Sequence, residues 1–160
     1  MLEARVNPAL FASGKMERLI VASGGNLRNL FSMTSNACDS ATLREASQVE
    51  AADVTGAIRR MRTDYERLLG ESPNDMELCD GKPHPISYEN KAARLVRIYN
   101  QDPVANVPDP VLYSLLRSRA VQEFNGERWF GVHPLVVDIL VTQRKIARPD
   151  ATEAIPGGTS

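Results

Sequence analysis

The sequence predicts a mainly α-helical protein in which a small helical bundle is followed by a second helical unit with one β-hairpin. Three observations favour this fold class. Apolar residues recur at three- and four-residue spacing over much of the chain, which is typical of amphipathic helices. An aperiodic polar stretch with glycine and proline near its ends, residues 71–87, separates two periodic segments. Asn125-Gly126 lies between two strand-like runs, as in a tight hairpin.

The first unit, residues 1–70, is predicted to contain three helices. Ser13 is expected to cap a short helix that ends at Gly24 and Gly25, because glycine adopts the left-handed C-cap conformation without strain. A longer helix follows, and Asp53 is the expected N-cap of the third. The apolar positions that define these helices are Met16, Leu19 and Ile20; Leu27, Leu30, Phe31, Thr34, Ala37, Cys38 and Ala41; and Val54, Ile58, Met61, Tyr65 and Leu68.

The third helix carries its charged residues opposite its apolar stripe. They are Arg59, Arg60, Arg62, Glu66 and Arg67. We interpret them as a solvated helix face.

The remaining chain is predicted to form a linker over residues 71–87, a second unit over 88–147 and a disordered tail over 148–160. In the second unit, apolar spacing indicates a helix over 88–100. A proline-punctuated connection leads to a short helix after Asp109, with Pro110 in its first turn. The hairpin follows, and a last helix begins near Pro134.

Two faces of the second unit matter for function. The short helix is predicted to bury Val111, Leu112, Leu115 and Leu116. Tyr113, Ser114 and Arg117 are expected to point away from this buried face. Trp129 and Phe130 are adjacent in a predicted strand, so they face opposite sides and one of them is expected in the core.

Composition indicates an ordinary globular protein and excludes several classes. The 160 residues are 42% apolar and carry a formal net charge of −1, so no global field favours nucleic acid or a basic partner. Two cysteines do not make a disulfide framework, and we expect a reducing, cytoplasmic location. The N-terminal stretch does not resemble a signal peptide, and no apolar run reaches the roughly 18 residues of a membrane span, so no membrane partner is expected.

The sequence does not predict an enzyme. A phosphate-binding loop is missing, because Lys15 is followed by methionine rather than serine or threonine, and no acidic strand end is present to hold magnesium. Cys79 and His84 are close in sequence, but a structural zinc site needs four ligands, and the only other cysteine and histidine are distant. We therefore expect no catalytic residue, metal site or cofactor in this chain. His133 is predicted to be a helix-start residue that packs beside Trp129 and is satisfied by backbone groups.

The order of the predicted elements resembles a known arrangement. A helix, a short helix, a hairpin "wing" and a last helix are typical of winged-helix domains. The stretch "SGGNLRNL" resembles the sensor-2 motif in the helical lid of AAA+ ATPases, and "ADVTGAIRRMRTDYERLL" resembles the last lid helix of the origin-recognition-like group. "FNGERWFGVHPLV" is similar to the hairpin and exit helix of winged helices in bacterial ATPases of this kind. The resemblance covers about residues 14–146, and it depends on the order of the motifs rather than on any one of them.

The resemblance implies a nucleotide-sensing role for Arg28. In such ATPases the sensor-2 arginine reaches from the lid towards the γ-phosphate of ATP bound in a preceding core, and a planar guanidinium suits phosphate oxygens. Gly25 and Asn26 would shape the start of its helix. The alternative is a surface arginine in an ion pair with Glu17 or Asp39. ATP and magnesium are then expected only together with an upstream ATPase core, in the same polypeptide or encoded by a neighbouring gene.

Two further hypotheses concern the winged helix. As a stand-alone DNA-binding module, it would place Ser114 and Arg117 in the major groove, with Arg119 and the wing residue Arg128 on phosphates. The slightly acidic chain weighs against a specific reader of duplex DNA. As a protein-interaction module, the winged helix would pack on a neighbour in an ATPase assembly, which suits its near-neutral charge.

Overall fold

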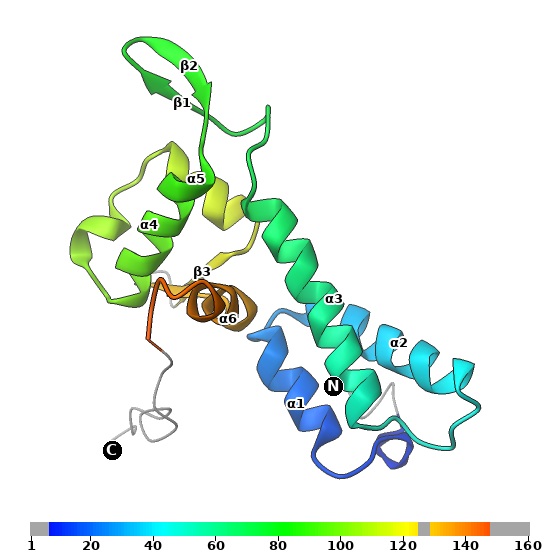
Figure 1. Cartoon of the computed structure of the whole chain (residues 1–160). Helices are drawn as coiled ribbons and strands as arrows, with labels where there is room; N and C mark the ends of the chain where they lie inside the picture. Colours follow the sequence, from blue (N-terminus) through cyan, green and yellow to red (C-terminus); the bar gives the residue numbers. More distant parts are fainter. Residues whose placement is uncertain (1–6, 125–128, 148–160) are drawn as a thin grey trace, which may run out of the picture.

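The computed structural model describes residues 7–124 and 129–147, and its N-terminal half is a bundle of three helices. After a 3-10 turn at Pro8–Leu10, the helices are α1 (Lys15–Ser23), α2 (Leu27–Leu43) and α3 (Ala51–Leu69). They pack against one another pairwise, as Figure 1 shows. Of the predicted apolar positions, Leu19, Leu30, Ala37, Val54 and Tyr65 are among those buried. Met33 is buried without having been predicted, and the predicted Ile20, Leu27, Phe31 and Leu68 are exposed because they lie at the edges of their apolar stripes.

The second half combines helices with two small antiparallel hairpins. Its elements are β1 (Met76–Cys79), β2 (Lys82–Pro85), α4 (Tyr88–Tyr99), a 3-10 helix (Pro103–Asn106), α5 (Pro110–Arg117), β3 (Val121–Phe124), β4 (Trp129–Val132) and α6 (Pro134–Thr142). Pro110 occupies the first turn of α5, and Asp109 caps that helix by accepting from the Leu112 N–H. The mainly α architecture, with a helical bundle followed by helices and a hairpin, is the predicted fold class.

The predicted hairpin is formed by β3 and β4. Their register pairs Val121 with Val132 and Phe124 with Trp129. The turn at Asn125-Gly126 falls within residues 125–128, outside the described residues. Phe130 is 8% exposed and Trp129 52% exposed, which confirms that the two aromatic residues face opposite sides.

A second hairpin lies where a linker was predicted. β1 and β2 pair antiparallel within residues 71–87 and project from one end of the molecule (Figure 1). The turn between them is Asp80-Gly81, with both residues at positive φ. Asp-Gly, like Asn-Gly, favours a two-residue hairpin turn, so the sequence did contain a local signal for this hairpin. The flanking strands were not predicted because their apolar and polar residues do not alternate clearly. Nearly every residue of this hairpin is exposed, so neither face needs to be apolar.

Two predicted helix caps are wrong by one and three residues. The N-cap of α1 is Gly14, in the left-handed region with φ 72°, rather than Ser13. The N-cap of α3 is Glu50, and Asp53 is its third helical residue. Asp53 is buried and accepts a 2.9 Å hydrogen bond from the Glu50 N–H, so it satisfies the helix start from inside the helix. The predicted cap residue is thus part of the cap, in a different position.

The two halves share one hydrophobic core. Buried residues of the bundle and of the second half form one continuous cluster, and α6 packs against both α1 and α3. The predicted tail, 148–160, lies outside the described residues. No helix in the described part is long and apolar enough to cross a membrane. The docking of α6 brings the start of α2 close to the turn that follows α5.

Candidate functional site

The turn between α1 and α2 is built around Gly24. This residue ends α1 in the left-handed conformation, with φ 56°, and donates to the Val21 carbonyl at 3.1 Å. A Cβ atom placed on Gly24 would lie 2.5 Å from Cδ of Pro134, at the start of α6. Glycine is therefore needed here both for its backbone conformation and for the close approach of α6. Gly25 follows with φ 80°.

Asn26 fixes the direction in which α2 begins. As N-cap, its Oδ1 accepts from the backbone N–H groups of Arg28 at 3.1 Å and Asn29 at 3.4 Å. The same oxygen accepts from Nη1 of Arg119 at 3.5 Å. The cap thus places Arg28 in the first turn of α2 and holds a second arginine beside it.

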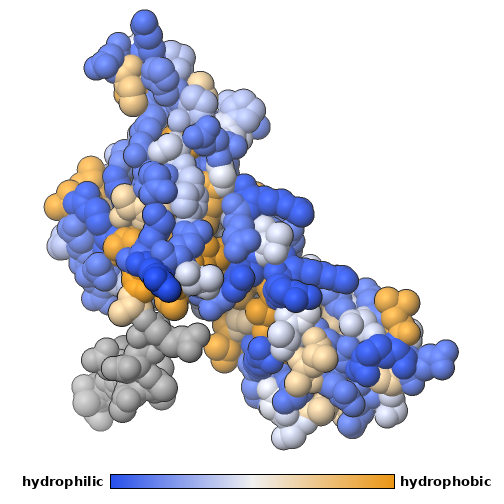
Figure 2. Space-filling view, in the orientation of Figure 1, coloured by the Kyte–Doolittle hydropathy of each residue, from blue (hydrophilic) through white to orange (hydrophobic). Residues whose placement is uncertain are grey.

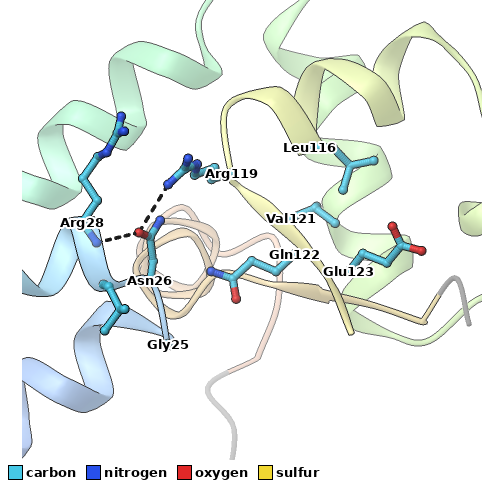
Figure 3. A pocket seen from close by; sticks show the side chains of 9 residues that line it. Gly25, Asn26, Arg28, Leu116, Arg119, Val121, Gln122 and Glu123 are labelled. Atoms are coloured by element: carbon cyan, nitrogen blue, oxygen red, sulfur yellow. Dashed lines mark hydrogen bonds between the residues drawn. The ribbon is translucent and has the colours of Figure 1, made fainter. Parts of the chain in front are cut away.

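An open depression of about 690 Å³ lies between the start of α2 and the turn that joins α5 to β3. Gly25, Asn26 and Arg28 line one side, and Arg119, Gln122 and Glu123 line the other. Figure 3 shows Arg28 and Arg119 on either side of Asn26. Arg119 has φ 58°, which turns the chain sharply between α5 and β3. The structure therefore adds Arg119, predicted for DNA, to the three residues predicted for nucleotide sensing.

Arg28 stands at an electrostatically unfavourable place. A cation in the first turn of a helix opposes the helix dipole at a cost of about 0.3–1 kcal/mol. Its side chain forms no ion pair with any described residue, so neither the Glu17 nor the Asp39 pair forms. Glu123 is the one carboxylate among the residues lining the depression, and no ion pair joins it to either arginine in the described part of the chain. The exposed guanidinium is thus available to an external anion.

A buried polar network lies beneath the depression and joins its two sides. His133 is 1% exposed, stacks on Tyr65 with ring centroids 4.6 Å apart, and lies 2.9 Å through Nε2 from the Ser23 carbonyl. Its Nδ1 accepts from the Leu135 N–H at 3.2 Å, which assigns the proton to Nε2. Asn29 donates to the Tyr65 hydroxyl at 2.7 Å. Tyr65 in turn faces the Arg119 carbonyl at 3.5 Å.

Burial favours the neutral form of His133. Burial lowers the pKa of His133, and the hydrogen bond to Ser23 offsets only part of that effect. The prediction that His133 starts a helix and is satisfied by backbone groups is confirmed, because it caps α6. The predicted packing beside Trp129 is wrong, because the aromatic neighbour of His133 is Tyr65, on the bundle. His133 therefore fastens the second half to the bundle.

Ser114 and Arg117 belong to a different cluster, centred on Asp75. Ser114 was predicted to point outwards, but it is 2% exposed and donates to Asp75 Oδ2 at 2.8 Å. Arg117 is exposed and contacts Asp75 Oδ1 through Nη2 at 2.8 Å. The buried Lys91 reaches Asp75 Oδ2 at 3.3 Å and the Gly70 carbonyl at 2.8 Å. The expected DNA-facing surface of α5 is thus partly covered by the segment that precedes β1.

The carboxylate of Asp75 is stabilised by two cations, Lys91 and Arg117. Burial raises the pKa of Asp75, but the hydrogen bonds from Ser114 and Lys91 outweigh it and hold the pKa below its usual value. Sequence reasoning missed this anchor because Asp75 and its partners come from three separate segments. The one local signal was Asp75 itself, but it lies in a polar stretch whose sequence does not indicate that any carboxylate would be covered.

The other candidate residues do not converge on a site. Arg128 lies outside the described residues. Cys79 and His84 are both exposed and lie on different strands of the β1–β2 hairpin, where their register partners are Lys82 and Glu77. Among the described residues, no group of three or more His, Cys, Asp or Glu side chains is placed to hold a metal ion.

Comparison with known protein families, curated proteins and solved structures found no match to this chain. The argument for function therefore depends on the residues and their geometry.

Proposed function

We propose that this chain is the non-catalytic C-terminal part of an AAA+-like ATPase, in which a lid-like bundle senses nucleotide through Arg28 and a winged-helix unit contacts DNA or a partner protein. The proposal places the protein in the cytoplasm, next to an ATPase core encoded upstream or in a neighbouring gene. That core would supply bound ATP and magnesium.

The observation that carries the proposal is the state of Arg28. Its guanidinium is exposed, unpaired among the described residues, and positioned by the Asn26 cap on the rim of an open depression. A cation that lacks an anionic partner and opposes its own helix dipole is stabilised when a phosphate binds. Arg119 provides a second guanidinium beside the same cap. These features suit a phosphate group presented by another domain.

The buried network suggests how such contact would be transmitted. Asn29 follows Arg28 directly and bonds to Tyr65, which stacks on His133 at the start of α6. A displacement of the first turn of α2 would therefore change the contacts at the start of α6 and at the Arg119 backbone. This link supports coupling between nucleotide state and the second half of the chain.

The direct test is ATP turnover by the core together with this chain. The core encoded upstream or next to the gene is expressed with the wild-type chain, with Arg28→Ala and with Arg28→Lys. We expect Arg28→Ala to lower turnover by about 10- to 100-fold, and Arg28→Lys to recover only part of it, since lysine lacks the planar donor pair.

The matched control is Arg144→Ala, which removes an exposed arginine that lines none of the depressions described here. It should leave turnover unchanged. Equal turnover with wild-type chain and Arg28→Ala, with both folded, would contradict the proposal. A neighbouring gene region that encodes no ATPase core would also count against it.

A second candidate function, protein binding by the wing, is favoured by one observation. Trp129 is 52% exposed and Phe124 39% exposed, and their rings are in tilted contact with centroids 5.2 Å apart. Exposed tryptophan is a frequent anchor of protein interfaces. We expect Trp129→Ala to weaken association with the ATPase core at least tenfold in calorimetry, with little dependence on salt. A steep loss of wild-type binding with salt would instead indicate an electrostatic contact.

A further inference from the structure

The exposed side of α3 and its surroundings form a concave surface lined by arginines. We propose that this surface binds the phosphate backbone of duplex DNA without reading its sequence. We call it the α3 arginine face, and its cationic residues are Arg28, Arg59, Arg60, Arg67, Arg117 and Arg119. The inference goes beyond the proposed function, because it assigns a nucleic-acid contact to the bundle and the adjoining end of α5 rather than to the winged-helix unit alone.

The surface is continuous. One depression of about 380 Å³ contains Arg59, Arg60 and Arg67, and a second of about 200 Å³ contains Arg28, Arg117 and Arg119. Both are lined by Asp64, so they adjoin. Figure 2 shows strongly hydrophilic residues projecting where α3 passes between the two halves of the molecule.

Charge is segregated onto this surface. The six arginines are a large share of the chain's 19 lysines and arginines, whereas the two depressions contain only one of its 20 acidic residues, Asp64. The remainder of a chain with net charge −1 is therefore distinctly acidic. Such separation produces a local positive field that the overall charge conceals.

Of these six cations, Arg117 is bound by Asp75 at 2.8 Å, whereas most of the others form no close ion pair with another described residue. Arg59 and Arg60 pair with no carboxylate in the described ranges. Arg67 approaches Asp64 at 3.6 Å, but both side chains are more than half exposed, so the pair adds little stability. Arg62 provides the contrast within the same helix, because it turns towards α6 and pairs with Asp138 at 3.0 Å. The arginines of α3 are thus divided between one that holds the fold and several that face solvent.

The spacing and the neighbours fit a phosphodiester backbone. Arg59 and Arg67 are two i+4 steps apart, about 12 Å along the helix axis, which matches the axial length of about three to four phosphates of one DNA strand. Asn36 lines the same depression and offers a neutral donor of the kind that accompanies arginine at phosphates.

Two observations favour duplex over single-stranded DNA and exclude base readout. The one aromatic side chain lining the two depressions, Tyr65, is buried and offers no platform on which an unpaired base could stack. On α5, Ser114 is buried and Arg117 is bound to Asp75, so neither is free to contact base edges. The expected binding is therefore electrostatic, weak at physiological salt and independent of sequence.

The test is fluorescence anisotropy of a labelled duplex of about 20 base pairs, titrated with the full chain from about 50 to 200 mM salt. The variants are Arg59→Ala/Arg60→Ala and the control Arg97→Ala/Arg144→Ala, which removes two exposed arginines outside the α3 arginine face. We expect the first double variant to weaken binding at least tenfold at about 50 mM salt, and to lower the slope of log K against log salt by about 2. The control variant should keep the wild-type affinity and salt slope, and duplexes of scrambled sequence should bind with the same affinity.

Several outcomes would overturn the proposal. These are no duplex binding by the wild-type chain at about 50 mM salt, equal losses in both double variants with native circular dichroism, or tighter binding of single-stranded than duplex DNA. A face that serves an acidic protein instead would give the first result. The experiment uses neither nucleotide nor a change at Arg28, so its outcome is separate from that of the turnover test above.

Discussion

At the scale of single residues, arginines in similar sequence contexts have different roles. Arg44 binds the buried Asp53 at 2.5 Å, Arg62 joins α3 to α6, and Arg28 has no partner in the described ranges. Sequence patterns place all three on helix surfaces or ends. Only the carboxylates that approach from elsewhere separate a residue that stabilises the fold from one available for binding.

Asp53 makes a pH-dependent contribution to stability. The hydrogen bond from Arg44, with help from the Glu50 N–H, lowers its pKa to about 2 from an ordinary 3.8. Because the folded-state pKa is depressed, the stabilisation is present above about pH 4 and is lost as the pH falls towards 2. We expect Asp53→Asn to lower the free energy of unfolding by about 1–2 kcal/mol at pH 6 and by much less at pH 2, measured by urea denaturation.

The control for this pH effect is Asp39→Asn, at an exposed carboxylate that forms no ion pair among the described residues. Its stability should follow that of the wild type at each pH. A difference between wild type and Asp53→Asn that stays constant from pH 6 to 2 would contradict the assignment.

The two cysteines should differ sharply in reactivity. Burial raises the pKa of the Cys38 thiol, and the neighbouring Asp39 raises it further, so little thiolate forms at neutral pH. Cys79 is exposed on β1. We expect one thiol per native chain to react rapidly with a disulfide reagent near pH 7.5, and the second at least tenfold more slowly. Rapid reaction of the Cys79→Ser variant would show that Cys38 is not protected.

At the scale of elements, the ends of helices depend on what packs against them. Gly24 ends α1, but it also leaves the space into which Pro134 fits at the start of α6. The β1–β2 hairpin, by contrast, is specified by its Asp-Gly turn and tied to the protein by Asp75. The end of α1 thus depends on a distant contact with α6, whereas the β1–β2 turn depends on its own two residues.

Gly24→Ala should be more damaging than an ordinary glycine replacement. The left-handed backbone costs an alanine about 1 kcal/mol, and the contact with Pro134 adds about 1–3 kcal/mol of overpacking. Gly14→Ala is the matched control, since Gly14 has φ 72° but nothing within 4 Å of an added Cβ. Urea denaturation should show a loss of about 2–4 kcal/mol for Gly24→Ala and about 1 kcal/mol for Gly14→Ala. Equal losses would mean that α6 can move away without cost.

At the scale of the whole molecule, the two halves are joined by a common core. The bundle contributes α1 and α3 to the site where α6 docks, and the buried His133 bonds across the junction. Two units predicted on either side of a linker are therefore in extensive contact. A signal at the start of α2 would have a short path to α6.

We expect the chain to unfold as one cooperative unit. Differential scanning calorimetry should give a single transition whose calorimetric and van't Hoff enthalpies agree, because unfolding α6 exposes core surface on both halves. Two resolved transitions would show that the bundle and the second half are thermodynamically independent. In that case the His133 network would not couple them.

Much of the local structure followed from the sequence, for identifiable reasons. The apolar stripe of α2, the proline in the first turn of α5 and the Gly24 C-cap each depend on residues within a few positions. The positions of Gly25, Asn26 and Arg28 at a helix start could be predicted for the same reason. The cap assignment at Asp53 was wrong because Glu50, three residues earlier, carries the same carboxylate group. The assignment at Ser13 was wrong because α1 begins from Gly14 in the left-handed conformation, without a side-chain cap.

By itself, the sequence determined the mainly helical class, most helices, the β3–β4 hairpin and the opposite facing of Trp129 and Phe130, because period and turn chemistry act within one element. Only the tertiary structure decided that Ser114 is buried, that Arg119 joins Arg28, and that α3 carries a continuous arginine face. These features arise where side chains far apart in the chain meet, and their energies depend on the desolvation and pairing of groups that no local pattern records.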